Sequence, residues 1–255
     1  MHALSQRKTL SLCFVLGFAL ACPVFAADPA LAVDRGLAQA NLNNAAGDYR
    51  SNVRWSFYDS GFLGDDFSVG AAGESWVIDS IRVWTVPGAA STEPQHLGDF
   101  YQDVRLYFGG DRESLTPIVA AQLHAGSDAV ANPHVRISDL TKSGAASYDD
   151  FGTNLHVWQV DFTGLSLAVQ GGVRYSFAAF GLGRPMPNLA GKTYAWFNAA
   201  SNAEFSDVRQ DGADGKMLLF TSGGKFESVF DGKGAGWDKS SDIDVQVFAH
   251  KVSAQ

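Results

Sequence analysis

The feature that most constrains the fold is a succession of short β-like runs that begins at about residue 53. Each run alternates apolar and polar residues or is continuously apolar, and Gly, Asn, Asp or Ser residues bound it. The runs cover residues 53–58, 65–69, 75–86, 100–110, 117–125, 155–162, 172–181, 193–199, 215–222 and 242–252. Many short strands with glycine-rich turns predict an all-β fold, an antiparallel two-sheet jelly-roll-like β-sandwich, with residues 53–252 as a single domain.

The run 75–86 contains a break in its alternation. Ile78 and Ile81 differ in parity, although both are expected on the buried face, so the register must change near Asp79–Ser80. One extra residue in a strand restores the buried face on both sides of the break. We therefore expect a β-bulge or a bend at this point.

Residues 27–52 show the only helical pattern, and it is weak. The segment 29–44 is long enough for a short helix, whereas Gly36 argues against a long one. We expect residues 27–52 to be an N-terminal extension that is partly irregular or forms a short helix.

The first 26 residues have the layout of a signal peptide. Arg7 and Lys8 form a basic start, residues 10–21 form a short apolar run, and small residues precede a cleavage site after Ala26. The prediction is a secreted protein, in the periplasm or the medium, with no transmembrane segment in the mature chain. Two alternatives are a retained membrane anchor and a lipoprotein attached through Cys22.

The composition of the mature chain limits how the domain can be stabilised and which classes of molecule it can bind. Both cysteines lie in the predicted signal peptide, so core burial, alone or together with a metal, must stabilise the domain. Loss of Arg7 and Lys8 changes the formal net charge from −8 to −10. An acidic chain without basic clusters is not expected to bind nucleic acid. The 27 acidic residues are mostly Asp, which favours turns and oxygen-rich cation sites.

A search for enzyme motifs is negative. The chain has no G-x-S-x-G elbow and no H-E-x-x-H or H-x-H spacing among its histidines. The Gly-Lys-Thr at 191–193 lacks the first glycine of a phosphate-binding loop, because Met186 stands there. These observations favour a non-enzymatic protein.

Three acidic clusters are candidates for a Ca²⁺ site. They are Asp65–Asp66, the segment 238–244 before the last strand, and the loop 206–217. Because chain ends often lie side by side in jelly rolls, the first two clusters could meet and share a cation through carboxylate oxygens. The candidate ligands are Asp66, Asp211, Asp214, Asp242 and Asp244. The alternative is that each cluster is a solvated turn that caps a strand end.

The adjacent pair Asp65 and Asp66 is interpreted as the entrance to a strand. Neighbouring side chains of a strand point to opposite faces, so the two carboxylates are not expected to act as an acid/base pair. Asp66 is the candidate ligand for a cation that would link this strand to the final strand.

Aromatic residues next to long loops are the candidates for ligand binding. An exposed ring can stack on the apolar face of a sugar while polar neighbours bind its hydroxyl groups. The candidates are Trp84, Tyr194, Trp196 and Trp237. The alternative is that these rings pack in the core, as most tryptophans do.

The order of several segments resembles a broad group of secreted bacterial jelly-roll-like β-sandwich domains found in surface and extracellular proteins. The segments are residues 35–55, 64–69, 76–84, 103–111, 156–181, 194–201 and 242–251. The resemblance implies a jelly-roll fold and an extracellular setting, and it implies no shared reaction and no catalytic residues. The chain lacks the C-terminal sorting anchor of some members, so we expect release into the periplasm or the medium.

The leading hypothesis is a secreted, non-enzymatic binding or structural module. Its ligand would be an extracellular glycan or a cell-surface component, and Ca²⁺ would stabilise the fold. One alternative is an extracellular polysaccharide hydrolase that uses two Asp carboxylates. A second alternative is a self-associating envelope or matrix component that pairs through sheet edges.

Overall fold

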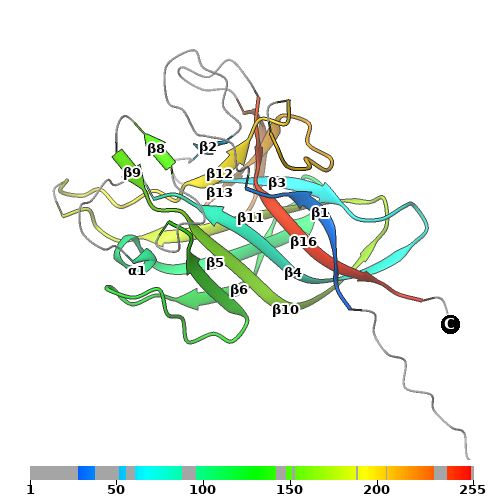
Figure 1. The fold of residues 1–255 in the computed structure, drawn as a ribbon, viewed down its shortest axis with the longest axis horizontal. Coiled ribbons are helices and arrows are strands. Elements are labelled where there is room, and N and C mark those ends of the chain that lie inside the picture. The colour runs from blue at the N-terminus through cyan, green and yellow to red at the C-terminus, as the bar shows by residue number, and fades with distance from the viewer. Residues whose placement is uncertain are drawn as a thin grey trace, which may run out of the picture.

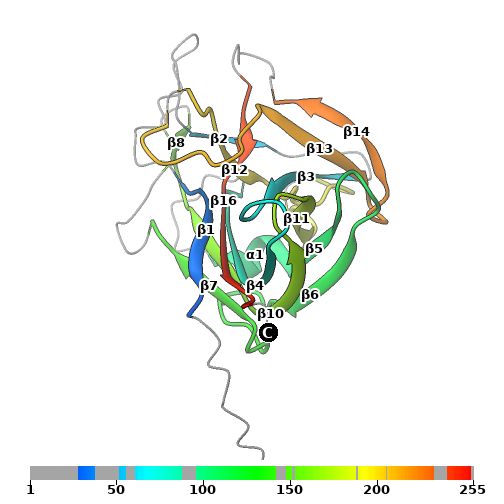
Figure 2. The same cartoon turned by 90° about the vertical axis from the view of Figure 1, so that its right-hand side faces the viewer.

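The computed structural model describes residues 28–37, 52–55, 61–87, 96–141, 148–150, 153–187, 189–204, 206–232 and 240–253. These residues form two antiparallel sheets, which confirms the predicted all-β two-sheet sandwich. Figure 2 shows the two layers, with one sheet on the left and the other on the right. No helix in these ranges is long and apolar enough to cross a membrane.

One layer is an eight-stranded sheet. Its strands are β1 (Ala30–Arg35), β2 (Asn52–Trp55), β4 (Ser75–Thr85), β7 (Val135–Asp139), β10 (Trp158–Gln170), β12 (Asn198–Ser201), β15 (Asp242–Ile243) and β16 (Val245–Lys251). The main order is β1-β16-β4-β10-β7, and β12 joins β2 and β15 to this sheet beside β4. The first and last strands of the described chain are therefore neighbours, as Figure 1 shows.

The other layer is a six-stranded sheet. Its strands are β3 (Gly61–Ser68), β5 (Tyr101–Gly110), β6 (Thr116–Gln122), β11 (Arg174–Gly183), β13 (Lys216–Thr221) and β14 (Phe226–Asp231). They follow the order β14-β13-β3-β11-β5-β6. A short helix, α1 (Leu97–Phe100), precedes β5, and β8 (Tyr148–Asp150) pairs with β9 (Thr153–Leu155) in a separate ribbon.

The core lies between the two sheets because the strands alternate buried and outward side chains. In β16, Val245 and Val247 are buried, while Gln246 between them faces outward and is half-buried. Ile81 and Phe177, from opposite sheets, belong to the same core cluster. The period of two in the sequence thus predicts which side chains form the core.

The structure corrects the prediction for the N-terminal extension. Residues 30–35 are the strand β1, which pairs antiparallel with β16, and not part of a helix. Only Val33 and Arg35 of β1 are fully buried. The alternation was missed because one of its two buried residues is charged, and a charged residue normally indicates a solvent-facing position.

Asp65 and Asp66 lie inside a strand and not at its entrance. β3 begins at Gly61, four residues before Asp65, and both aspartates are buried. Gly64 sits where the backbone of β11 approaches closely, because an added Cβ would lie 2.3 Å from the carbonyl oxygen of Phe177. A glycine that permits this contact looks like a turn residue in the sequence.

The predicted irregularity in β4 is confirmed. Phe248 pairs with Ser80 and Ala249 pairs with Ile78, so Asp79 is the extra residue of a bulge. The sequence also did not predict β7 and β14, both at sheet edges, or the two strands of the separate ribbon, β8 and β9. Edge strands carry weaker alternation because one of their neighbours is missing.

Candidate functional site

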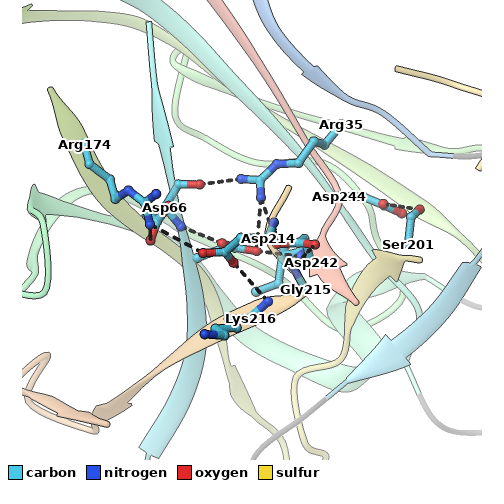
Figure 3. Close-up of polar contacts among 11 residues, drawn as sticks. Arg35, Asp66, Arg174, Ser201, Asp214, Gly215, Lys216, Asp242 and Asp244 are labelled. Carbon is cyan, nitrogen blue, oxygen red and sulfur yellow. Dashed lines mark hydrogen bonds and ion pairs between the residues drawn. The ribbon is translucent and has the colours of Figure 1, made fainter. Parts of the chain in front are cut away.

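A buried arginine contacts two of the predicted acidic clusters, Asp65–Asp66 and the segment 238–244. Arg35 is 1% exposed, and its Nη1 lies 3.4 Å from an Asp65 carboxylate oxygen and 3.5 Å from one of Asp242. Its Nη2 donates a 2.6 Å hydrogen bond to the backbone carbonyl of Asp66. Figure 3 shows the guanidinium directed toward Asp66 and Asp242. We call Arg35, Asp65, Asp66, Asp242 and Asp244 the Arg35 cluster.

Backbone N–H groups hold the carboxylates of this cluster in place. Asp65 accepts hydrogen bonds of 2.7 Å each from the N–H groups of Asp66 and Ile243. Asp242 accepts the N–H groups of residues 214–215 at 3.0 and 2.8 Å. Charge-assisted bonds to backbone donors are among the stronger hydrogen bonds in proteins. They connect β3, β15 and the loop before β13 around the end of β1.

A more exposed arginine lies beside Asp66. Nη1 of Arg174 is 3.2 Å from a carboxylate oxygen of Asp66 and 3.5 Å from one of Asp214. The side chain of Arg174 is 41% exposed, whereas that of Asp66 is 8% exposed. The two neighbouring aspartates of β3 therefore point to different partners, Asp65 to Arg35 and Asp66 to Arg174. This geometry agrees with the argument that they cannot converge on one bond.

Asp244 is the most enclosed acid of the cluster. It is 0% exposed, and its Oδ1 accepts a short hydrogen bond from the hydroxyl group of Ser201 on β12. Its Oδ2 and the Nε of Arg35 have no hydrogen-bond partner within the described ranges. Such buried polar atoms carry a desolvation penalty, which tertiary packing must offset.

Burial makes the carboxyl groups of the cluster harder to ionise. Desolvation raises the pKa of Asp65 to about 8, although the Arg35 charge opposes the shift. Desolvation also raises the pKa of Asp66 and Asp242, against Arg174 and Arg35 respectively, and raises that of Asp244 well above its usual value. The cluster therefore binds protons in the folded state that an unfolded chain releases.

The expectation that the acidic clusters meet is confirmed, and two details are corrected. Asp65, and not Asp66, bridges to the last strands, and the cation that it binds there is the guanidinium of Arg35. The interpretation as solvated turns is wrong for the four aspartates of the cluster, which are all buried. Sequence reasoning missed Arg35 because its segment was expected to be irregular or helical.

The remaining metal candidates lie apart or at the rim of the cluster. Asp211 accepts the backbone N–H of Asp34 at 2.9 Å and the Nη2 of Arg209 at 2.6 Å. Asp214 contacts Arg174, as described above. Across the described ranges, no group of three or more His, Cys, Asp or Glu side chains is arranged to hold a metal ion. The Ca²⁺ site thus stays a prediction from the sequence.

We expect Ca²⁺ to leave the thermal unfolding temperature of the EDTA-treated protein unchanged. A Ca²⁺ ion needs six to eight oxygen ligands, and Arg35 together with backbone N–H groups already occupies the oxygens of Asp65 and Asp242. Calorimetry in EDTA and then in excess Ca²⁺ measures the effect. A rise of several degrees would contradict this expectation and support the calcium hypothesis, because a ligand of the folded state raises the unfolding temperature.

The aromatic candidates are mostly packed and not displayed. Trp84 and Trp196 are each 4% exposed, so the expectation that they offer open rings is wrong. Trp84 packs in a small cluster that includes Val86, and Trp196 contacts the ring of Tyr101 at 4.9 Å. Tyr194 is half-buried. Trp237 lies outside the described residues.

The outer face of the eight-stranded sheet carries a set of polar side chains that sequence reasoning missed. In register across five strands lie Asp34, Gln246, Arg82, Asp161 and Arg136. We call these five residues the polar row. They belong to β1, β16, β4, β10 and β7, which are consecutive in the sheet, and Figure 1 shows the first four of these strands side by side. The signal in the sequence was a polar or charged residue at an outward position of each strand.

Hydrogen bonds connect the first four members of the polar row. The Nε2 of Gln246 donates to Asp34 at 2.9 Å, and the Nη1 of Arg82 donates to Gln246 at 3.2 Å. The Nε of Arg82 donates to Asp161 at 2.5 Å. The guanidinium of Arg82 also lies 5.4 Å from the ring centre of Phe248, which supports it from below. The row is thus pre-organised while Arg82 and Asp161 remain 31% and 17% exposed.

Comparison with known proteins adds little. No protein-family model and no curated protein matches the chain. One similar solved structure is the D2–D3 domains of the flagellar cap protein FliD from Escherichia coli, at 9% sequence identity and a TM-score of 0.18. The match covers 80% of this chain and 99% of that chain. A similarity this low carries no argument about fold or function.

Proposed function

We propose that the protein is an exported, non-enzymatic binding module that holds an extracellular glycan on the outer face of its eight-stranded sheet. The observation that carries the proposal is the polar row. Export is supported by the signal-peptide layout of residues 1–26. Binding is supported by polar groups that are half-exposed, in register and already held by one another.

The chemistry of the polar row suits hydroxyl groups. Arg82 offers only donors, Asp161 only acceptors, and Gln246 both, while each sugar hydroxyl donates and accepts. A merely solvated sheet face needs polar residues but does not need them linked across four strands. Pre-organised side chains lose less conformational entropy when a ligand binds, which favours a binding role for this face.

The hydrolase alternative has less structural support. It requires two carboxylates that reach a substrate, whereas Asp65 and Asp242 are each 1% exposed and both face Arg35. Their contacts connect strands from distant parts of the chain. The self-associating alternative stays a prediction, which sedimentation at increasing protein concentration would test.

Replacing Arg82 with glutamine should weaken glycan binding roughly tenfold or more, because the change removes the central donor of the row and leaves Asp161 held, among the described residues, by Gln159 alone. The mature protein is first tested by affinity electrophoresis in gels that contain cellulose derivatives, β-1,3-glucan, xylan or chitosan. The polymer that retards it is then used to compare the variants.

A matched control is available on the other sheet. Arg105 pairs with Asp103 in β5, at 35% and 14% side-chain exposure, much as Arg82 pairs with Asp161. Arg105→Gln should leave retardation and the unfolding temperature unchanged, since exposed ion pairs contribute about 0–1 kcal/mol. Equal retardation of Arg82→Gln and Arg105→Gln would show that the outer face of the eight-stranded sheet is not the binding surface. The absence of retardation in every gel would overturn the proposed function.

A further inference from the structure

We infer that the ligand of this face is an uncharged, extended polyhydroxyl chain that crosses the strands along the polar row. The inference rests on the proposed function and specifies its ligand class. It depends on three properties of the row, which are its length, its alternation of charge and the position of Arg136 at its end.

The length of the row favours a chain over a single sugar. Its five residues lie on consecutive strands of the sheet, so it spans four strand spacings. At about 4.8 Å for each spacing, this distance is ~19 Å. A small ligand can contact only one or two of these strands. A chain that lies perpendicular to the strands can contact all five.

The alternation of charge favours an uncharged ligand. Asp34 and Asp161 carry negative charges, Arg82 and Arg136 carry positive charges, and Gln246 is neutral, so the row has no net charge. A polyanion would meet two carboxylates along this path, and a polycation would meet two guanidinium groups. Like charges brought together at an interface cost binding energy, whereas hydroxyl groups can match both signs.

Arg136 is the member of the row that contributes least to the contacts within the sheet. It is exposed at the edge strand β7, and its register partner Asp161 is already bound by Arg82. Its guanidinium is therefore available to a ligand that extends beyond the centre of the row. A ligand that covers only Arg82 and Asp161 would not reach it.

The test compares ligands of two lengths by titration calorimetry. The probes are the disaccharide and the hexasaccharide of β-1,4-linked and of β-1,3-linked glucose, with hexagalacturonate as a charged hexamer. We expect a neutral hexasaccharide to bind at least roughly tenfold more tightly than its disaccharide and than hexagalacturonate. We expect Arg136→Gln to weaken the hexasaccharide several-fold and to leave the disaccharide unchanged.

Arg112→Gln is the matched control for Arg136→Gln, because Arg112 is 48% exposed on the turn that follows β5 in the other sheet. It should alter neither affinity. Equal affinity for hexasaccharide and disaccharide, or no effect of Arg136→Gln, would overturn the extended path while the proposed function survived. Tighter binding of hexagalacturonate would overturn the uncharged class. Failure of every probe, together with failure of the polymer gels, would overturn both.

Discussion

Replacing Arg35 with methionine should lower the free energy of unfolding by about 3–5 kcal/mol, the usual effect of removing one partner from a buried ion pair. Arg35 is the positive charge that both Asp65 and Asp242 contact in the interior, and it also binds the carbonyl group of Asp66. For a domain of this size the loss corresponds to a fall of about 10 °C in unfolding temperature. Urea and thermal unfolding, followed by circular dichroism at neutral pH, measure both quantities.

Two further variants keep this test informative if Arg35→Met does not fold. Arg105→Met removes an arginine from a half-exposed pair and should cost about 1 kcal/mol or less. The double change Arg35→Met with Asp65→Asn also removes the acidic group that faced Arg35 and should recover part of the lost stability. Similar stabilities for Arg35→Met and Arg105→Met would contradict the structural role of the cluster.

The unfolding temperature should fall by several degrees as the pH rises from about 4 to 8. The pKa of Asp65 is about 8 in the folded protein, whereas an unfolded aspartate titrates near 3.9. Between these values the folded state binds a proton that the unfolded state has released, so stability declines as the pH increases. Burial also raises the pKa of Asp66, Asp242 and Asp244, and these groups act in the same direction.

Calorimetry at pH 5, 6.5 and 8 in buffers of equal ionic strength tests this dependence. Asp65→Asn should flatten the curve, because its amide does not ionise in this range. Glu74 contributes little to the result, since hydrogen bonds from Lys251, Ala71 and Trp76 lower its pKa to about 2 and an unfolded glutamate titrates near 4.3, so both values lie below the tested window. An unfolding temperature that rises between pH 5 and 8 would show that the buried carboxyl groups are ionised in the folded protein throughout.

Much of the sheet architecture could be predicted from alternation alone. The run 242–252 appears as β15 and β16, separated only at Asp244, and the bulge at Asp79 lies where the parity of apolar residues changes. Both features are local, because the period of two follows from the geometry of each strand. The meeting of residues 65 and 242 was also expected, from the proximity of chain ends in such folds.

The alternation of residues in the sequence predicted less of the candidate site than of the sheets. Trp84 and Trp196 lie near loops in the sequence, yet packing against distant residues buries both rings. The polar row depends on strand register, which no single segment contains. A shift of one residue in the pairing of β4 with β10 would move Arg82 away from Asp161.

By itself, the sequence determined the strand content, the sandwich class and the alternation of inward and outward residues, because each strand carries its own period. Only the tertiary structure decided that Arg35 is buried and which groups neutralise it. The reason is that the cost of burying a charge depends on partners brought from other strands. Arg35 is separated from Asp66 by 31 positions, and Asp65 from Ile243 by 178. The environment of such a residue exists only once these strands have assembled.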